Sequence, residues 1–569
     1  MPRDDTPATT TPGAPGPEAS AQELPASPAR RKALPSAGRL GGVLTAVVLV
    51  AAGGGLVSAA ALSPQDSASS RPVEAPLAAV PAGSSIGVCP GPARLLEGAP
   101  VGTDPQFSPE SATARSDVNA VVLGSSGGVL PGSRLASLAG TALVELAPAA
   151  PESGSSAPAA PESASSAPSG GPPVQAAGVV SQRGVDGVSV LSADAQNGRQ
   201  AAAGAVMRYA ADDGDLRGSA AVACQQPAND LWLVGANTSL GRTAVLNLTN
   251  ASSSPATVSL DLFGAKGQIQ APGSRGLLVA PGTTRSVILG GLAPGQERLS
   301  VRVRSAGGPV AAAIQQSVLR GLTPGGVEFI APAAAPALRQ VVTGVDIQDP
   351  AGLADLTGKP GFGDAGPALQ ITVPGSADAV VAVKLFGRDG QKALPGGGAV
   401  TAKAGSVTEI PLSGVPAGPY TVAVSSDVSF TAAARVTRGL AAADPVDFAW
   451  SAASARLGSQ HVVPVPGSGE RHLVFGAPEG RATITYTPVT ADGKIRAAAA
   501  ADIAGGTTAS IAVPAEVEGS ALVGYLVSAA GDPAYGAVLV QQDGRPDVST
   551  VAIAPGAAGQ EQVPVTLGY

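Results

Sequence analysis

The chain has 569 residues, a formal net charge of −7 and only 14% charged residues. This acidic balance, without basic blocks, argues against nucleic acid as a partner. Hydrophobic residues make up 44%, so the weakly hydrophobic, highly charged profile of a disordered protein is absent over most of the sequence. Frequent Gly and Pro between runs of Val, Ala and Thr are typical of short strands joined by tight turns, so we expect an all-β fold.

The N-terminal region combines a polar tail with one uncharged run. Residues 1–39 are rich in Pro, Ala, Thr and Ser and predict a disordered cytoplasmic tail. A helix over residues 40–62 would reach roughly 35 Å, enough to cross a hydrocarbon core of about 30 Å. Cations precede this run, with no acidic residue among them: Arg30, Arg31, Lys32 and Arg39. Because cations stay on the cytoplasmic side, we expect a single-pass signal-anchor in the cell membrane, with the N-terminus cytoplasmic and the C-terminus extracellular.

A cleaved signal peptide is the alternative. Val57-Ser58-Ala59 is a small-residue cleavage pattern, so cleavage near Ala59 would give a secreted protein. The long tail before the apolar run, and the length of the run itself, favour the uncleaved anchor.

Beyond the predicted span we expect a stalk at residues 63–83 and a membrane-proximal β domain at residues 84–227. A low-complexity tract within that domain, residues 147–177, carries a near-duplicate in which residues 150–158 recur as 160–168. Such a sequence cannot bury apolar surface, so we interpret it as a disordered insert. Strand-like runs flank it at residues 120–123, 142–146, 188–191, 205–209 and 220–224.

The two cysteines of the chain, Cys89 and Cys224, both follow the predicted span. Disulfides persist in exported proteins, so we expect a bridge that ties the first strand of this domain to its last. In the loop-entropy model such a bridge stabilises by about 5 kcal/mol. Two separate buried thiols are the alternative.

The sequence repeats after residue 225. Residues 262–267 (LFGAKG) recur as residues 385–390 (LFGRDG) and, more weakly, as residues 489–493. Each copy is followed by a Gly and an alternating strand. The spacing of the copies is about that of one immunoglobulin-like sandwich, which runs to roughly 100 residues. We therefore predict three β-sandwich modules, at residues 228–340, 341–460 and 461–569.

Local patterns support these modules. In residues 378–386, Val380, Ala382 and Lys384 share one face of a strand and Val381, Val383 and Leu385 share the other, and the turn signal Asp389-Gly390 that follows predicts a hairpin. The approach to Tyr420 is similar to that of fibronectin-type sandwiches, in which a tyrosine closes a corner. Leu299 and Val523 stand at the equivalent places of the other copies. The expected fold is a series of immunoglobulin- or fibronectin-like sandwiches behind one transmembrane helix.

Chemistry-bearing motifs are weak. Ser126 lies in a G-x-S-x-G pattern without a following helix or a nearby histidine. Residues 361–366 match a dinucleotide fingerprint, but Pro367 and a strand follow instead of a helix. His461 and His472 have no third ligand for a metal. We expect no catalytic residue, cofactor or metal site, and we do not expect an enzyme.

Two segments carry a resemblance to a known family. They are Cys89-Pro90-Gly91-Pro92 after the predicted span, and the block from Cys224 to Gly235 with the strand around Asn247. Together they resemble an actinobacterial family of membrane-anchored exported proteins that has a placeholder, domain-of-unknown-function name. Leu233 stands where that family more often has Phe. The resemblance covers residues 84–569 and implies a β-rich ectodomain in the cell envelope, but no activity.

The leading functional hypothesis is an extracytoplasmic structural or interaction scaffold of the cell envelope, with an unknown envelope protein or glycan as its partner. A module that binds cell-wall glycan or lipid is the alternative, and an envelope enzyme ranks third. The alternative requires an exposed aromatic–carboxylate cluster, for which Trp450 with Asp444 and Asp447 is the local candidate.

Overall fold

The computed structural model describes residues 77–80, 82–96, 110–125, 128–148, 176–196, 198–542, 544–557 and 561–564. They belong to one compact unit, Pro76–Tyr569. The predicted tail, the predicted membrane span, the stalk up to residue 76 and residues 149–175 of the predicted insert lie outside the described residues. Within the described ranges, no helix is both long and apolar enough to cross a membrane.

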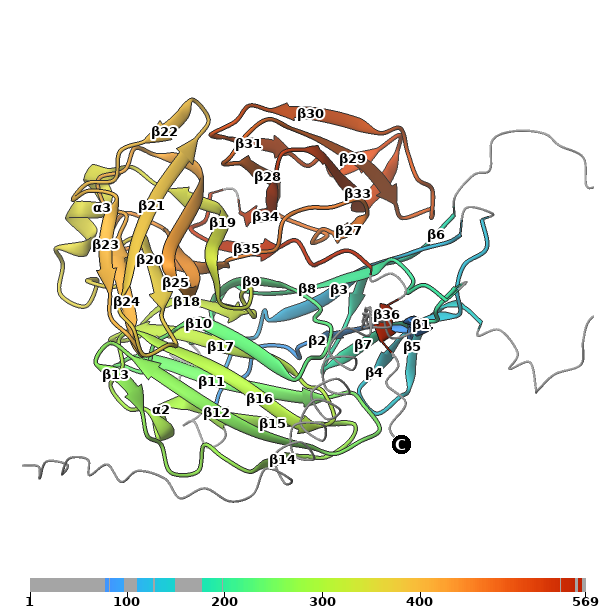
Figure 1. The fold of residues 1–569 in the computed structure, drawn as a ribbon, viewed down its shortest axis with the longest axis horizontal. Coiled ribbons are helices and arrows are strands. Elements are labelled where there is room, and N and C mark those ends of the chain that lie inside the picture. The colour runs from blue at the N-terminus through green and yellow to red at the C-terminus, as the bar shows by residue number, and fades with distance from the viewer. Residues whose placement is uncertain are drawn as a thin grey trace, which may run out of the picture. The chain divides into compact units, whose positions relative to one another are not determined.

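The prediction of an all-β fold is confirmed, because antiparallel sheets form nearly all of the regular structure (Figure 1). The described residues contain two short helices, α2 (Leu289–Leu292) and α3 (Pro350–Thr357). Asp349 caps α3 by accepting a 2.8 Å hydrogen bond from the Gly352 N–H. The strands group into four structural repeats, each with two sheets.

The first repeat (residues 85–223) has the strand orders β2-β7-β4-β5 and β6-β3-β8-β9. Its strands are β2 (Ser85–Cys89), β3 (Arg115–Leu123), β4 (Ser133–Ser137), β5 (Ala142–Ala147), β6 (Ala177–Gly184), β7 (Ser189–Ala193), β8 (Ala203–Ala211) and β9 (Gly218–Ala223).

The second repeat (residues 230–330) has the orders β10-β16-β12-β13, with β14 also on β12, and β15-β11-β17-β18. Its strands are β10 (Asp230–Ala236), β11 (Arg242–Asn250), β12 (Ala256–Gly264), β13 (Gly267–Ile269), β14 (Leu277–Val279), β15 (Thr283–Ile288), β16 (Leu299–Gly307), β17 (Ala311–Arg320) and β18 (Thr323–Ile330).

The third repeat (residues 337–452) is built around one long strand that serves both sheets. The first half of β25 pairs with β19 and β21, and its second half pairs with β20 and β26. The strands are β19 (Ala337–Ile347), β20 (Ala368–Thr372), β21 (Ala379–Gly387), β22 (Gly390–Lys392), β23 (Ala399–Ala402), β24 (Val407–Pro411), β25 (Gly418–Arg438) and β26 (Asp447–Ala452).

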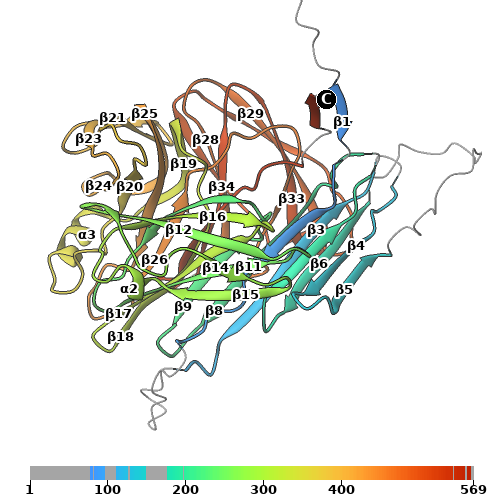
Figure 2. The same cartoon turned by 60° about the horizontal axis from the view of Figure 1, so that its bottom comes forward.

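The fourth repeat (residues 461–552) has the orders β27-β33-β29-β30 and β31-β28-β34-β35. Its strands are β27 (His461–Pro464), β28 (Glu470–Ala477), β29 (Ala482–Thr490), β30 (Ala499–Ile503), β31 (Thr507–Ala512), β32 (Glu516–Val517), β33 (Ser520–Gly531), β34 (Tyr535–Gln541) and β35 (Val548–Ala552). Outside the repeats, β1 (Leu77–Val80) pairs antiparallel with β36 (Glu561–Pro564), which is the dark red strand next to β1 in Figure 2.

The four repeats share one strand order, and the second, third and fourth also carry the sequence repeat. The recurrent LFG segments form equivalent turns, with Gly264 opposite Gly267 and Gly387 opposite Gly390. The hairpin predicted to end at Asp389-Gly390 is therefore confirmed. The first repeat has the same strand order without that motif. The first repeat is therefore similar to the others in how its strands pair, and not in the recurrent motif.

The cores of the four repeats are joined in a closed cycle. The core of the first repeat includes Phe329 of β18, and the core of the second includes Trp450 of β26. The core of the third includes Val548 of β35, and the core of the fourth includes Ala221 of β9. Each last strand thus packs on the core of the preceding repeat, and β9, β18, β26 and β35 contact one another around the centre.

The predicted disulfide between Cys89 and Cys224 is confirmed. Cys89 ends β2 and Cys224 directly follows β9, so the bridge ties the first strand of the first repeat to its last. It closes a sequence separation of 135 residues. A loop of that length gives the bridge a large effect on the entropy of the unfolded chain.

Trp450 of the third repeat is a large aromatic residue buried between two repeats. It is 6% exposed and packs in the core of the second repeat. Gly235 on β10 has a φ of 122°, and a Cβ there would lie 2.5 Å from the Trp450 ring. A glycine is therefore required both by the backbone and by the ring.

We expect Gly235→Ala to lower the free energy of unfolding by about 2–5 kcal/mol, because it adds strain at a positive φ to overpacking against Trp450. Chemical denaturation of the full chain measures the loss. The matched control is Gly267→Ala, at a φ of 128° with nothing within 4 Å of the added Cβ. Equal losses in the two variants would contradict a role for Trp450 packing.

Candidate functional site

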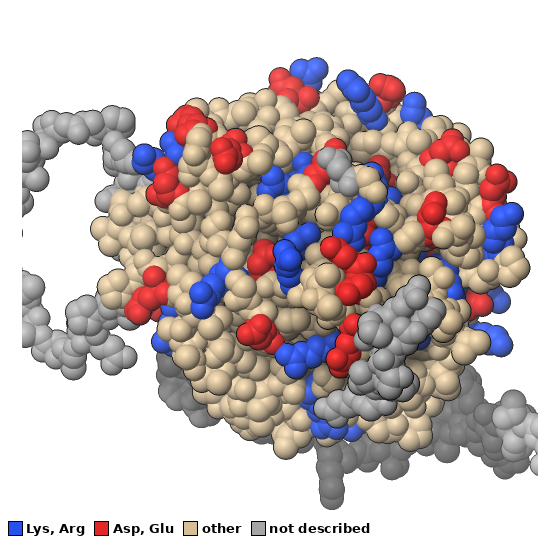
Figure 3. Space-filling view, turned by 180° about the vertical axis from the view of Figure 1, so that it is seen from behind, with Lys and Arg blue, Asp and Glu red and all other residues tan. Residues whose placement is uncertain are grey.

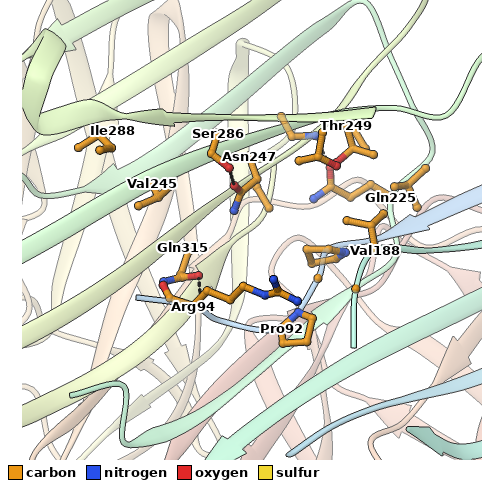
Figure 4. Close-up of a pocket in the computed structure, with 18 of the residues that line it drawn as sticks. Pro92, Arg94, Val188, Gln225, Val245, Asn247, Thr249, Ser286, Ile288 and Gln315 are labelled. Carbon is orange, nitrogen blue, oxygen red and sulfur yellow. Dashed lines mark hydrogen bonds between the residues drawn. The ribbon is translucent and has the colours of Figure 1, made fainter. Parts of the chain in front are cut away.

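A groove of about 840 Å³ lies between the first and second repeats (Figure 4). Its floor is the outer face of the sheet formed by β15, β11 and β17. Its wall is the segment that follows β2, from Pro90 to Leu96, together with Gly187 and Val188. The groove therefore joins the block after Cys89 to a strand of the second repeat.

The side chains of the floor are arranged in rows across three strands. The central strand β11 contributes Val245, Asn247 and Thr249 to it, while the alternate residues Leu246 and Leu248 are buried in the core. The strand registers place three rows across the floor: Ile288, Val245 and Gln315; Ser286, Asn247 and Ala313; and Thr284, Thr249 and Ala311. The two alanines keep the floor low beneath the polar positions.

Hydrogen bonds hold the polar floor in place. Ser286 Oγ donates to Asn247 Oδ1 at 2.7 Å, and the hydroxyls of Thr249 and Thr284 lie 3.0 Å apart. Asn247 Nδ2 has no hydrogen-bond partner among the described residues, so it is left to donate to a ligand. The floor offers amide and hydroxyl groups in fixed positions.

Gln315 and the disulfide fix the wall against the floor. The Arg94 N–H donates to Gln315 Oε1 at 2.9 Å, and Gln315 Nε2 donates to the Arg94 carbonyl at 2.7 Å. The bridge from Cys89 to Cys224 anchors the wall at its start. Beside it, Val88 and Gln225 exchange two backbone hydrogen bonds of 2.7 and 2.9 Å.

Arg94 is the one charged residue among those that line the groove in the described structure. Figure 4 shows its side chain extending from Gln315 toward Pro92, and Arg94 Nη2 donates to the Asp186 carbonyl at 2.6 Å. The described lining contains no carboxylate, His, Cys, Lys or Tyr. This set of groups can bind a polar chain and attract an anion, but it offers no acid–base pair.

A second polar cluster lies where the four last strands meet. Glu328 of β18 is completely buried, and its Oε2 lies 3.0 Å from Ser549 Oγ on β35. Ser549 Oγ accepts from the Ala221 N–H of β9 at 2.8 Å and lies 3.2 Å from the Ala221 carbonyl. Asp447 of β26 accepts from the Val548 N–H at 3.1 Å. Ser549 and Asp447 thus form hydrogen bonds with backbone groups of edge strands, which have no further strand to pair with.

The hydrogen bonds favour a protonated Glu328. The single hydroxyl proton of Ser549 can go to the Ala221 carbonyl or to Glu328, but not to both. A protonated Glu328 donates to Ser549 Oγ and leaves the Ser549 proton for Ala221. Burial, which the nearby Asp447 charge reinforces, raises the pKa of Glu328 well above its usual range, although the Phe329 N–H and Ser549 oppose the shift.

The residues proposed for ligand contact do not form an exposed cluster. Trp450 and Asp447 are buried, and only Asp444 is exposed. The Arg435 guanidinium lies 5.6 Å from the Trp450 ring centroid and covers it. The prediction of an exposed aromatic–carboxylate cluster is wrong, because β26 lies between two repeats and does not face solvent.

The remaining motifs have structural roles where the structure describes them. Ser126 lies outside the described residues. In the loop at residues 361–366, Asp364 accepts hydrogen bonds from Arg242 Nη2 at 2.7 Å and from Arg320 Nη1 at 2.6 Å. Through these bonds to Asp364, the loop joins the third repeat to the second. No group of three or more metal-ligating side chains occurs among the described residues.

Reasoning from the sequence missed the groove, although it singled out both of its sides. Both the segment from Pro90 to Pro92 and the strand around Asn247 belong to the motifs that carry the family resemblance. The polar residues Asn247 and Thr249 alternate with the buried Leu246 and Leu248, which signals a strand with one partly polar face. Only the fold shows that this face lies under the Pro90 segment.

Charge is mixed on the surface seen from behind in Figure 3. Positive and negative residues are interspersed over a mostly uncharged face, with no broad field of one sign. Such a face gives no electrostatic footprint for a polyanion.

Residues 179–514, more than half of the chain, match the model of a protein family described as a family of unknown function, DUF5719. No curated protein matches the chain, and neither does any solved structure.

We expect Glu328 to make stability depend on pH. Because its pKa is raised in the folded state, its contribution is complete below its unfolded value of about 4.3 and is lost as the pH rises toward the folded value. Glu328→Gln keeps the hydrogen bond to Ser549 without the ionisation, so it should stabilise the protein at pH 7 by about 1–3 kcal/mol. Denaturation midpoints from pH 4 to pH 8 measure this.

The control for this variant is Glu516→Gln, at an exposed position on β32. It should leave the pH profile unchanged. A Glu328→Gln profile parallel to that of the unaltered protein would contradict the assignment.

Proposed function

The chain belongs to the DUF5719 family, whose function is unknown, and from this premise we propose that it is an interaction scaffold of the cell envelope. In this proposal a single span at residues 40–62 holds the chain at the membrane, and the ectodomain docks an extended segment of another envelope component in its groove. The groove over β15, β11 and β17 is the observation that carries the proposal.

The groove suits a polymer segment better than a small substrate. It runs over three strands, its floor donates and accepts through amides and hydroxyls, and Arg94 adds one positive charge. An extended peptide or glycan presents repeated donors and acceptors, which can form hydrogen bonds with the amides and hydroxyls of the floor. We propose binding instead of catalysis because the described lining lacks a nucleophile–base pair.

We assign the four repeats to immunoglobulin- or fibronectin-like sandwiches. Each has two antiparallel sheets packed face to face around a shared core. The third repeat supports this assignment further, since Tyr420 Oη donates to the Pro416 carbonyl at 2.8 Å, as in a tyrosine corner. Such modules commonly present surfaces to partners, which suits a scaffold.

Export to the cell envelope is supported by two features. The uncharged run at residues 40–62 has cations on its N-terminal side, which favours a cytoplasmic N-terminus. The bond from Cys89 to Cys224 requires an oxidising compartment to persist.

A cell-wall glycan is the second candidate partner. The row of Ser286, Asn247 and Ala313 and the row of Thr284 and Thr249 resemble the side-chain chemistry that binds sugar hydroxyls. The described lining has no aromatic ring on which a sugar could stack, so an extended peptide segment of an envelope protein ranks first.

Protease added to intact cells should digest the ectodomain and spare residues 1–39, because the cations before the span keep the tail inside. N-terminal sequencing of the mature chain should begin at the start of the tail. A mature chain that begins near Ala60 would show cleavage and secretion. Protection of the whole chain from protease would contradict export.

A photoreactive amino acid at Ser286 should yield a discrete adduct in intact cells, because this position lines the groove. The control position is Val380, which is 59% exposed on β21 and outside the groove lining. Arg94→Gln should reduce the Ser286 adduct by about tenfold, equivalent to about 1.4 kcal/mol of binding. Identical adducts from both positions would overturn the groove as the docking site, and a glycan adduct would favour the second candidate.

A further inference from the structure

A separate cavity of about 540 Å³ lies at the far ends of the central strands. Each repeat contributes to its lining the segment that leaves its last strand. These segments are residues 224–228 after β9, 331–335 after β18, 453–455 after β26 and 553–557 after β35, whose last residue Ala552 also lines the cavity. The cavity therefore exists only because the four repeats close into a cycle.

The lining is mostly aliphatic, and its polar side chains are those of Ser85, Gln200, Gln225, Gln226, Ser454 and Thr550. Among the described residues that line it, none carries a charge and none is aromatic. Alanine and proline predominate on the four segments, and larger side chains close the sides, among them Leu191, Leu231, Val463, Val538 and Ile553. The rim differs, since Gln226 is exposed there.

We propose that this cavity binds the acyl chain of an ester lipid. Because the wall is uncharged and mostly aliphatic, a peptide or glycan would lose most of the hydrogen bonds of its polar groups on entry. It also rejects a free fatty acid in its ionised form, because the described lining has no Arg, Lys or His to pair with a carboxylate. An ester head needs only a hydrogen-bond donor, which the Gln226 amide at the rim can supply.

The size of the cavity fits this ligand. An apolar cavity of about 150 Å³ holds a six-carbon ring, so in proportion 540 Å³ holds about twenty carbon atoms. That is the length of one long acyl chain. An empty cavity of this size forfeits the dispersion contacts of its walls, which an acyl chain would restore.

The cavity and the groove are neighbouring but distinct. Gln225 lines both, and its backbone pairing with Val88 forms part of the wall between them. The acyl chain is recognised by apolar burial alone, whereas the groove uses amides, hydroxyls and Arg94. The lipid proposal therefore does not depend on the partner of the groove.

The test uses the full chain in lipid vesicles that contain a phospholipid with a diazirine at the end of one long acyl chain. After illumination, mass spectrometry maps the adducts. We expect adducts on the four segments that line the cavity. Adducts confined to residues 40–62 or to exposed surface positions would overturn the proposal. A free fatty acid with the same diazirine should label the four segments at least tenfold less, and equal labelling would overturn the assignment to an ester lipid.

Two cavity-filling variants sharpen the test. Ala333→Phe and Ala552→Phe place a ring at half-buried positions of the lining, and each should reduce the adducts by at least tenfold. The matched control is Ala500→Phe, at an exposed position on β30 outside the lining, which should label normally. Melting temperatures confirm folding of each variant. Unchanged labelling of a folded filled variant would refute the site, and if neither variant folds, the adduct map of the unaltered chain decides.

Discussion

The structure depends on the burial of four edge strands against one another. In every repeat the last strand, β9, β18, β26 or β35, ends a sheet and has one edge without a neighbouring strand. An open edge leaves backbone donors and acceptors unpaired and invites pairing with other chains. Here each edge strand packs on the core of the preceding repeat, and the fourth repeat closes on the first. Side chains such as Ser549 and Asp447 supply the hydrogen bonds that a further strand would have made.

The packing of the repeats on one another positions both proposed sites. At one end of the central strands, the segments that leave them surround an aliphatic cavity. Beside it, the packing of the first repeat on the second brings the Pro90 segment over the outer face of β11, which creates the groove. The disulfide and the Val88–Gln225 pairing stand between the two sites and brace both. An open string of modules would lack the cavity, because all four repeats contribute to its lining.

The closed cycle also explains the buried carboxyl groups. Glu328 and Asp447 are costly to bury as charges, and nothing in their local sequence predicts burial. They serve edge strands from different repeats, so their partners lie far away along the chain: Ser549 is 221 residues from Glu328. The burial of Trp450 has the same cause. An aromatic residue close to two aspartates in sequence indicated a ligand platform, but its neighbours in space are Gly235 and Arg435.

The sequence by itself determined the β character, the hairpin turns at the recurrent glycines, the pairing of Cys89 with Cys224 and the repeat in three of its four copies. These features depend on local alternation, turn chemistry and a cysteine pair with no competitor, all of which are written in consecutive residues. The tertiary structure alone decided the fourth copy, the closed cycle, the groove and the aliphatic cavity. Strand order and packing between repeats join residues hundreds of positions apart, and contacts of that range leave no periodic signal in a single sequence.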